Sequence, residues 1–174
     1  MANNQIVDLR NEGIDLAVRY TCASSVPPGS RRLFGETIAP VAHPSLAVKS
    51  LRSGSWLSKL TLLEFDDARY PWLQWRTWLE AAGRKDAKPR AFVHFNQYDL
   101  VMQAALAGQG VALGRLELIA PQVDEGRLVV IDPPRHGAAI AHGHWLIHAE
   151  AQPRREVTDV AAWIEAEASA PASA

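Results

Sequence analysis

Cysteine is almost absent from this sequence, which contains a single one, Cys22. One thiol has no partner within the chain, so no internal disulfide can form. Scarce cysteine is typical of proteins from reducing compartments, and we therefore expect a cytoplasmic protein. The residues around Cys22 match no signature of a catalytic cysteine, so an inert thiol is the simpler interpretation.

Long apolar runs are lacking as well. A membrane span needs about 18 consecutive apolar residues, and no stretch of this sequence approaches that length. The N-terminal stretch MANNQIVDLRNEG also has no apolar core of the kind found in a secretory signal. The sequence predicts no association with a membrane.

An excess of either charge is missing too. The chain has 18 basic and 19 acidic residues, with a net charge of -1. A large nucleic-acid surface needs a basic excess, so we expect none on this chain, although a DNA-binding module can be carried elsewhere. Apolar residues make up 48% and charged residues 21%, which predicts a packed core.

Apolar residues recur with strand and helix periods along the chain. The expected strands are residues 13–20, 33–36, 37–43, 60–66, 90–96, 110–114, 127–131 and 142–150. The expected helices are residues 70–83, 97–107 and 155–168, with a helix or turn over 116–126. Residues 33–36 and 37–43 suggest a strand pair. The alternation predicts an α/β fold with mostly parallel sheets.

Three tryptophans fall on the expected helix 70–83. Trp72, Trp75, Leu79 and Ala82 lie at a spacing that forms one stripe along a helix. This spacing favours core packing over ligand stacking. Trp78 falls off the stripe and is expected to be partly exposed.

A polar cluster begins the expected helix 97–107, in the stretch HFNQYDLVMQAALAGQGVALGR. Asn96 is a suitable N-cap. The first N–H groups of a helix have no internal partner and carry partial positive charge, so a carboxylate or phosphate can bind there. Two interpretations stay open: an anion site, or plain capping by Asn96.

The order of several stretches resembles a known family. These are GIDLAVRY, LFGETIAPVAHPSL, the W-x-x-W-x-x-WL helix, FNQYDLVMQAALAGQGVALGR, DEGRLVVIDPP and HWLIHA. Together they are similar to the effector-binding domain of LysR-type transcriptional regulators, most of all the subgroup of the glycine-cleavage activator. The resemblance covers nearly the whole chain.

The resemblance implies a type 2 periplasmic-binding-protein-like fold of two α/β lobes joined by crossover strands. Residues 1–41 and 146–174 would form the first lobe, and residues 42–145 the second. Such a domain is not an enzyme and holds no cofactor. It binds a small effector between its lobes and regulates transcription, while DNA is bound by a separate helix-turn-helix.

The same resemblance implies which residues meet the effector. In the first lobe these are Arg19 and Tyr20, and Arg19 suits a carboxylate because a guanidinium binds it through two hydrogen bonds. An ordinary salt bridge of Arg19 is the alternative. The positions implied in the second lobe are Ala42, His43, Phe95, Asn96 and Gln97.

Part of the family pattern has no counterpart in this sequence. The DNA-binding half is missing, as are a first strand, a long helix and most of a second strand of the effector domain. We therefore expect an incomplete first lobe with an unpaired sheet edge and exposed apolar surface. An alternative function follows: an interaction fragment that dimerises with itself or with a full-length LysR-type regulator.

A histidine-rich segment raises a further alternative, a metal-dependent hydrolase. His142, His144 and His148 share one face of an extended strand, with His136 nearby. No partner carboxylate or HExxH motif accompanies them, so a satisfied or solvated cluster is the simpler interpretation. Such imidazoles would still make the surface sensitive to pH.

Three other motifs have structural interpretations. Asp66 and Asp67 follow a strand and suit a turn better than acid–base catalysis. The stretch GQGVALG lacks the GK[ST] of a phosphate loop. The basic run RKDAKPR suits a solvated loop better than nucleic-acid binding.

Overall fold

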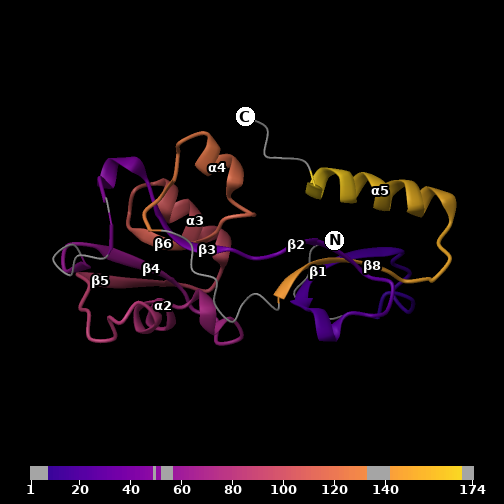
Figure 1. The fold of residues 1–174 in the computed structure, drawn as a ribbon, viewed down its shortest axis with the longest axis horizontal. Coiled ribbons are helices and arrows are strands. Elements are labelled where there is room, and N and C mark those ends of the chain that lie inside the picture. The colour runs from indigo at the N-terminus through magenta and orange to yellow at the C-terminus, as the bar shows by residue number, and fades with distance from the viewer. Residues whose placement is uncertain (1–7, 49, 52–56, 133–141, 170–174) are drawn as a thin grey trace. The chain divides into compact units, whose positions relative to one another are not determined.

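The computed structural model describes residues 8–48, 50–51, 57–132 and 142–169 (Figure 1). The chain divides into two compact units. Met1–Gly35 and Ile140–Ser173 form the smaller unit, and Glu36–Ala139 forms the larger one. Each boundary lies six residues before the one expected from the family resemblance.

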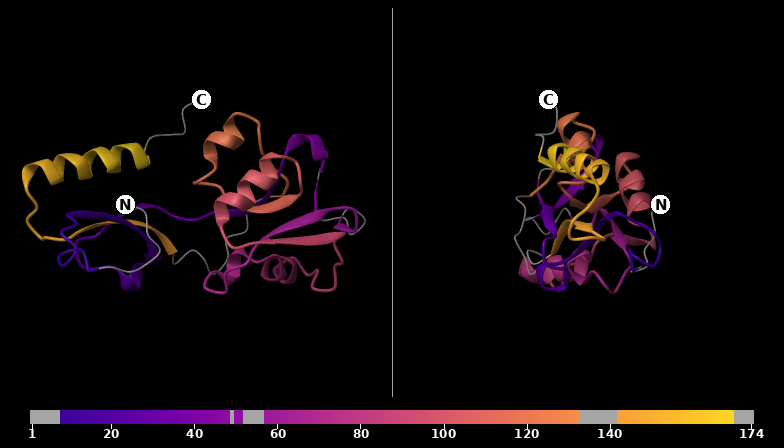
Figure 2. Two further views of the ribbon diagram at one scale, coloured as in Figure 1. Left: turned by 180° about the vertical axis from the view of Figure 1, so that it is seen from behind. Right: turned by 90° about the vertical axis from the view of Figure 1, so that its right-hand side faces the viewer.

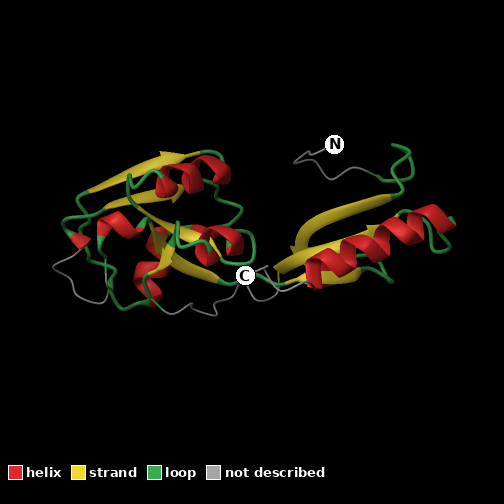
Figure 3. Cartoon of the chain, turned by 90° about the horizontal axis from the view of Figure 1, so that it is seen from above, coloured by secondary structure: helices red, strands yellow, loops and turns green. Residues whose placement is uncertain are grey.

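The smaller unit is built on a three-stranded antiparallel sheet. Its strands are β1 (Leu16–Cys22), β8 (His142–His148) and β2 (Arg31–Phe34), in the order β1-β8-β2. A short 3-10 turn, η1 (Ala23–Ser25), follows β1. Helix α5 (Arg155–Ser169) runs along this sheet (Figure 3) and buries Val157 and Ala161.

The larger unit is built on a five-stranded sheet of order β5-β4-β6-β3-β7. Its strands are β3 (Ile38–Ala42), β4 (Thr61–Phe65), β5 (Ala91–Phe95), β6 (Val111–Arg115) and β7 (Val129–Val130). Its helices are η2 (Pro44–Leu46), η3 (Pro71–Leu73), α2 (Trp75–Ala81), α3 (Tyr98–Leu106) and α4 (Ala120–Asp124).

Helices cover both faces of the larger sheet. Helix α2 lies on one face and helices α3 and α4 lie on the other (Figures 1 and 2). Alternate strand residues therefore enter different cores: Leu62 packs with Trp75 on the α2 side, and Leu63 packs with Val101 on the α3 side. None of the helices in the described ranges is long and apolar enough to cross a membrane.

The expected α/β alternation is confirmed, but the expectation of mostly parallel sheets is wrong in detail. Among the described strands, only β4 pairs in parallel, with β5 and with β6; β3 runs antiparallel to β6 and β7, and the smaller sheet is antiparallel throughout. The expected pairing of residues 33–36 with 37–43 is also wrong, because β2 pairs with β8 while β3 pairs with β6. Strand direction is set by such long-range pairing, which local periodicity does not reveal.

The expected helix 70–83 is two elements rather than one. Gln74 has an extended backbone (φ -96°, ψ 135°) and separates η3 from α2. The buried Glu64 carboxylate accepts the Trp75 backbone N–H at 3.1 and 3.2 Å and so holds the start of α2. Core packing of the tryptophans is confirmed, and Trp78, expected to be partly exposed, is only 7% exposed.

The glycines of GQGVALG serve packing. Gly108 ends α3 at φ +70°. A Cβ at Gly110 would lie 2.5 Å from the Thr61 carbonyl oxygen, and one at Gly114 would lie 2.6 Å from Ile119 Cδ1. The segment therefore allows β6 to pass closely beside its neighbours, and the interpretation that it is not a phosphate loop fits this packing.

The edges of both sheets carry exposed apolar side chains. In the smaller unit β1 is an edge strand with Val18 50% exposed, and α5 leaves Trp163 63% exposed. In the larger unit Phe92 and Val93 lie exposed on the edge strand β5. Among the described residues, β1 and β2 are the edge strands of the smaller sheet, and Val18 and Trp163 provide exposed apolar surface of the kind expected for the first lobe.

Candidate ligand-binding site

The parallel strands of the larger unit end together at one edge of the sheet. β4 ends at Phe65, β5 at Phe95 and β6 at Arg115. In α/β sheets, small ligands bind outside the carboxyl ends of strands, beside the helix that follows. Here that helix is α3, which begins three residues after Phe95.

The first turn of α3 is exposed at this edge. The N-cap is Gln97, with an extended backbone (φ -132°, ψ 130°), and not Asn96 as the sequence suggested. Within the described residues, the Gln97 side chain makes no capping hydrogen bond. Asn96 and Gln97 are both exposed. The Gln97 side chain therefore does not occupy the N–H groups of this turn, and the first N–H groups of a helix have no partner within the helix.

One partly buried contact fixes the position of this turn. The backbone N–H of Arg115, at the end of β6, donates to the Tyr98 hydroxyl oxygen at 2.7 Å. The guanidinium of Arg115 lies over the Tyr98 ring, with its Cζ 5.7 Å from the centroid. Phe65 meets the same ring edge-on at 6.0 Å. Burial raises the pKa of Tyr98, so its hydroxyl stays protonated at neutral pH.

A buried ion pair continues from this contact. Arg115 pairs with Glu36, whose side chain is 1% exposed. Glu36 is the first residue of the larger unit and directly precedes Thr37 and β3. Thr37 donates its N–H to the Glu117 carboxylate at 2.8 Å. Contacts thus run from the first turn of α3 through Arg115 to the point where the chain enters the unit.

These residues were missed from the sequence. Glu36, Tyr98 and Arg115 each stand directly beside an apolar strand or helix stretch, which is a weak signal because polar and charged residues often flank such stretches. Their convergence depends on the antiparallel register that places Ile38 opposite Arg115. Local pattern does not contain that register.

The site residues expected in the larger unit fall at two edges of the sheet. Phe95, Asn96 and Gln97 lie together at the carboxyl edge. Ala42 ends β3, which runs antiparallel to β6, and His43 follows it, so both lie at the opposite edge, where β6 begins. Ala42 is 1% exposed, and His43 caps η2 through its Nδ1, which accepts the Ser45 N–H at 3.2 Å.

The two remaining expected residues belong to the smaller unit. Arg19 and Tyr20 are half-buried in β1, opposite Trp145 and His144 in the register with β8. The Tyr20 ring lies 5.5 Å from that of His142 and 5.1 Å from that of His144. Arg19 and Tyr20 lie on opposite faces of the sheet because side chains alternate along a strand.

The histidines of β8 do share one face, as expected, but they are spread along it. Phe34 stacks on His144 at 4.4 Å. His148 is six residues from His142, a separation of about 20 Å along a strand. In the part of the chain that the structure describes, no group of three or more His, Cys, Asp or Glu residues is placed to hold a metal. His136 lies outside the described residues.

The carboxylates Asp66 and Asp67 occupy a turn, as expected. The Asp66 N–H donates to the Phe95 carbonyl at 2.8 Å. Asp67 accepts hydrogen bonds from the Arg69 guanidinium at 2.6 to 3.1 Å. The Arg69 side chain lowers the pKa of Asp67, which keeps that carboxylate ionised.

Comparison with known families gives one match over almost the whole chain. Residues 1–169 match the LysR substrate binding domain. The resemblance noted from the sequence is therefore confirmed.

Two relatives show how much of a longer protein this chain represents. The HTH-type transcriptional activator AmpR of Rhodobacter capsulatus is 29% identical over 126 residues, which cover 72% of this chain and 42% of that protein. The glycine cleavage system transcriptional activator of Escherichia coli (strain K12) is 31% identical over 122 residues, covering 68% of this chain and 38% of that protein. The chain spans less than half the length of these relatives.

Solved structures share the fold. The effector domain of AmpR from Pseudomonas aeruginosa has a TM-score of 0.67 at 24% identity, covering 98% of this chain and 80% of that one. The AmpR effector binding domain from Citrobacter freundii has a TM-score of 0.66 at 19% identity, covering 95% and 80%. These likenesses confirm the expected periplasmic-binding-protein-like α/β fold.

Proposed function

The chain belongs to the family of LysR substrate-binding domains, and on that premise we propose that it senses a small anionic metabolite and thereby regulates transcription. The effector class is a carboxylate or an amino-acid-like compound. The domain is not an enzyme, works in the cytoplasm, and reaches DNA through a helix-turn-helix supplied by a longer chain or by a partner. Its two units correspond to the two effector lobes.

The observation that carries this proposal is the exposed first turn of α3. Asn96 and Gln97 stand exposed before Tyr98, at the carboxyl edge of β4, β5 and β6. The N–H groups of that turn carry partial positive charge and favour an anion. Asp99 already offsets part of this charge, so hydrogen bonds must add to it.

The smaller unit carries Arg19 and Tyr20, which the family resemblance implies meet the effector. Arg19 is assigned the effector carboxylate, because a guanidinium binds a carboxylate through two hydrogen bonds. Replacing Arg19 with Lys keeps the positive charge but removes the bidentate hydrogen bonding of a guanidinium to a carboxylate. A weaker response of the Arg19→Lys protein to the effector would support this assignment, and an unchanged response would refute it.

The contacts of Arg115 suggest how occupancy could reach the rest of the molecule. A ligand that shifts the first turn of α3 also shifts Tyr98, whose hydroxyl is hydrogen-bonded to the Arg115 backbone N–H. Arg115 in turn holds Glu36 at the entry to the larger unit. A change of this kind requires a ligand that binds two arrangements with different affinity.

A screen of melting temperature against amino acids and small organic acids tests the proposal. A ligand that binds only the folded state stabilises it by about 2.7 kcal/mol when its free concentration is about 100-fold above Kd. We expect at least one compound of this class to raise the melting temperature. A folded protein that responds to none of them would refute the proposal.

A second function, association with another copy or with an intact regulator, is favoured by the exposed apolar residues. Val18 and Trp163 of the smaller unit are at least half exposed, and Phe92 is 44% exposed on the edge strand β5. Trp163→Ser should lower the measured mass of any self-associated species in sedimentation analysis. A wild-type chain that stays monomeric and retains no LysR-type regulator on co-purification would exclude this function.

A further inference from the structure

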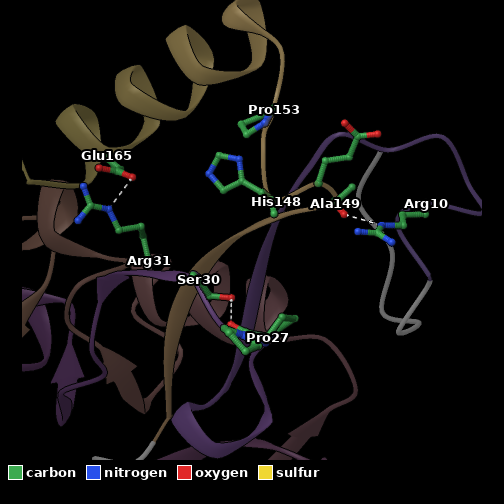
Figure 4. Close-up of a pocket in the computed structure, with 12 residues that line it drawn as sticks. Arg10, Pro27, Ser30, Arg31, His148, Ala149, Pro153 and Glu165 are labelled. Carbon is green, nitrogen blue, oxygen red and sulfur yellow. Dashed lines mark hydrogen bonds and ion pairs between the residues drawn. The ribbon is translucent and has the colours of Figure 1, made fainter.

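A cavity of about 450 Å³ lies within the smaller unit and involves none of the residues assigned above. Its walls come from the loop before β2, the segment that follows β8, and helix α5 (Figure 4). Ligand sites of small molecules begin at about 300 Å³, so this space accepts a molecule the size of an amino acid or a dipeptide.

One wall is a rigid turn. Ser30 donates its backbone N–H to the Pro27 carbonyl at 3.2 Å and its hydroxyl to the same oxygen at 2.7 Å. Pro28 and Gly29 occupy the central positions, with Gly29 at φ +84°. This is the sequence and geometry of a type II turn, which both residues favour. The wall therefore exists before any ligand arrives, which lowers the cost of binding.

The lining carries both signs of charge. Arg10 donates its Nε–H to the Ala149 carbonyl at 2.8 Å, and Arg31 pairs through Nε with Glu165 Oε1 at 3.2 Å. These contacts, drawn in Figure 4, use one nitrogen of each guanidinium and orient its remaining donors. Glu150 also lines the cavity, so the lining contains two arginines and two glutamates.

A histidine adds an unsatisfied polar atom. Nδ1 of His148 is buried and has no hydrogen-bond partner within the described residues. In Figure 4 the His148 ring lies between the Arg31–Glu165 pair and Ala149. Buried polar atoms are nearly always hydrogen-bonded, so a missing partner at a cavity wall indicates a group that the cavity receives.

We propose that this cavity binds a small zwitterion of the amino-acid or dipeptide class. Its carboxylate would meet the arginines and its ammonium the glutamates. A lining with two charges of each sign gives no net attraction to a simple anion or cation, whereas a zwitterion satisfies both signs at once. This is a second ligand site, whose lining belongs wholly to the smaller unit, whereas α3 belongs to the larger one.

Amide NMR of the whole chain tests the proposal with L-alanyl-L-alanine as the probe. We expect saturable shifts at the amides of Ser30, Arg31, Ala149 and Glu150. N-acetyl-L-alanyl-L-alanine lacks the ammonium and L-alanyl-L-alaninamide lacks the carboxylate. Each should bind about tenfold more weakly, because each loses a charged hydrogen bond.

Matched variants identify the site. Arg10→Met keeps most of the side-chain stem, removes the guanidinium and should weaken the dipeptide by about tenfold. Arg155→Met, on an exposed position of α5 outside the cavity lining, should not. Equal binding of the acetylated dipeptide would overturn the zwitterion assignment, and no saturable shift at the four amides would overturn the site. Shifts confined to the first turn of α3 would report the effector site instead and would also overturn this proposal.

Discussion

The backbone N–H of Arg115 donates a hydrogen bond to the hydroxyl oxygen of Tyr98 across 2.7 Å. This bond joins the last residue of β6 to the first residue of α3, so it ties the edge of the sheet to the start of the helix. The Tyr98 hydroxyl oxygen thus accepts a backbone N–H of the sheet, as carbonyl oxygens of neighbouring strands do elsewhere.

Replacing Tyr98 with Phe removes that acceptor and leaves the Arg115 N–H unpaired. An unpaired buried donor costs about 1 to 3 kcal/mol, so urea denaturation should show a loss of unfolding free energy of this size. The Arg115 amide should also shift in NMR spectra. A change below about 0.5 kcal/mol, the usual range of surface substitutions, would show that water replaces the bond.

We predict that Glu64 makes the stability of the fold depend on pH. Burial raises the pKa of this carboxyl above 4.5, with the Trp75 N–H opposing the shift. A raised pKa means that the folded state holds the proton more tightly than the unfolded state. The favourable contribution of Glu64 to the free energy of unfolding is therefore present at acid pH. It is lost as the pH rises through the pKa of Glu64 in the folded state.

Glu64→Gln removes this dependence while its amide oxygen still accepts the Trp75 N–H. Relative to Glu64→Gln, wild type should lose unfolding free energy as the pH rises from about 4 to 7. Glu80→Gln, at an exposed position of α2, serves as the control. A constant difference between wild type and Glu64→Gln across that range would contradict the prediction.

We predict a steric penalty when Gly110 is replaced by a residue that has a Cβ atom. A Cβ at this position would lie 2.5 Å from the Thr61 carbonyl oxygen and 3.0 Å from Leu63. Gly110→Ala should therefore cost about 1 to 3 kcal/mol, the usual penalty of overpacking, as measured by thermal denaturation. Gln109→Ala, an exposed neighbour, should be nearly neutral. Equal melting temperatures of the two variants would show that the strands separate easily.

We predict that the thiol of Cys22 has a lowered pKa. Its Sγ lies 3.1 Å from Ser24 Oγ and 3.0 Å from Ser25 Oγ, and these hydroxyls lower the pKa of Cys22 below 9.0. Replacing both serines with alanine should move the midpoint of iodoacetamide alkylation to higher pH. An unmoved midpoint would show that the hydroxyls do not stabilise the thiolate.

The elements that periodicity predicts best are those whose pattern is local. Strands β4 and β6 lie within one or two residues of their expected bounds, and α5 has its expected start. The break at Gln74 was not predictable, because the Glu64 carboxylate that holds Trp75 lies 11 residues away. The capping residue of α3 was misplaced by a single position, from Gln97 to Asn96.

The arrangement of the candidate site residues was predictable only where one segment supplies them. Residues 95–97 stand where the sequence placed them, at the start of α3. Ala42 lies at the other edge because β3 runs antiparallel to β6, and the Glu36–Arg115 pair depends on the same register. Sheet direction follows from contacts between distant segments, so no local pattern contains it.

The most direct test of effector sensing compares two variants of α3 with wild type, using the compound that most raises the melting temperature. Asn96→Ala with Gln97→Ala alters the proposed site, and Gln103→Ala alters an exposed position of the same helix. Calorimetric titration should show binding about tenfold weaker or more in the double variant and unchanged in Gln103→Ala. Equal affinity of all three proteins would contradict the assignment of the effector site to the start of α3.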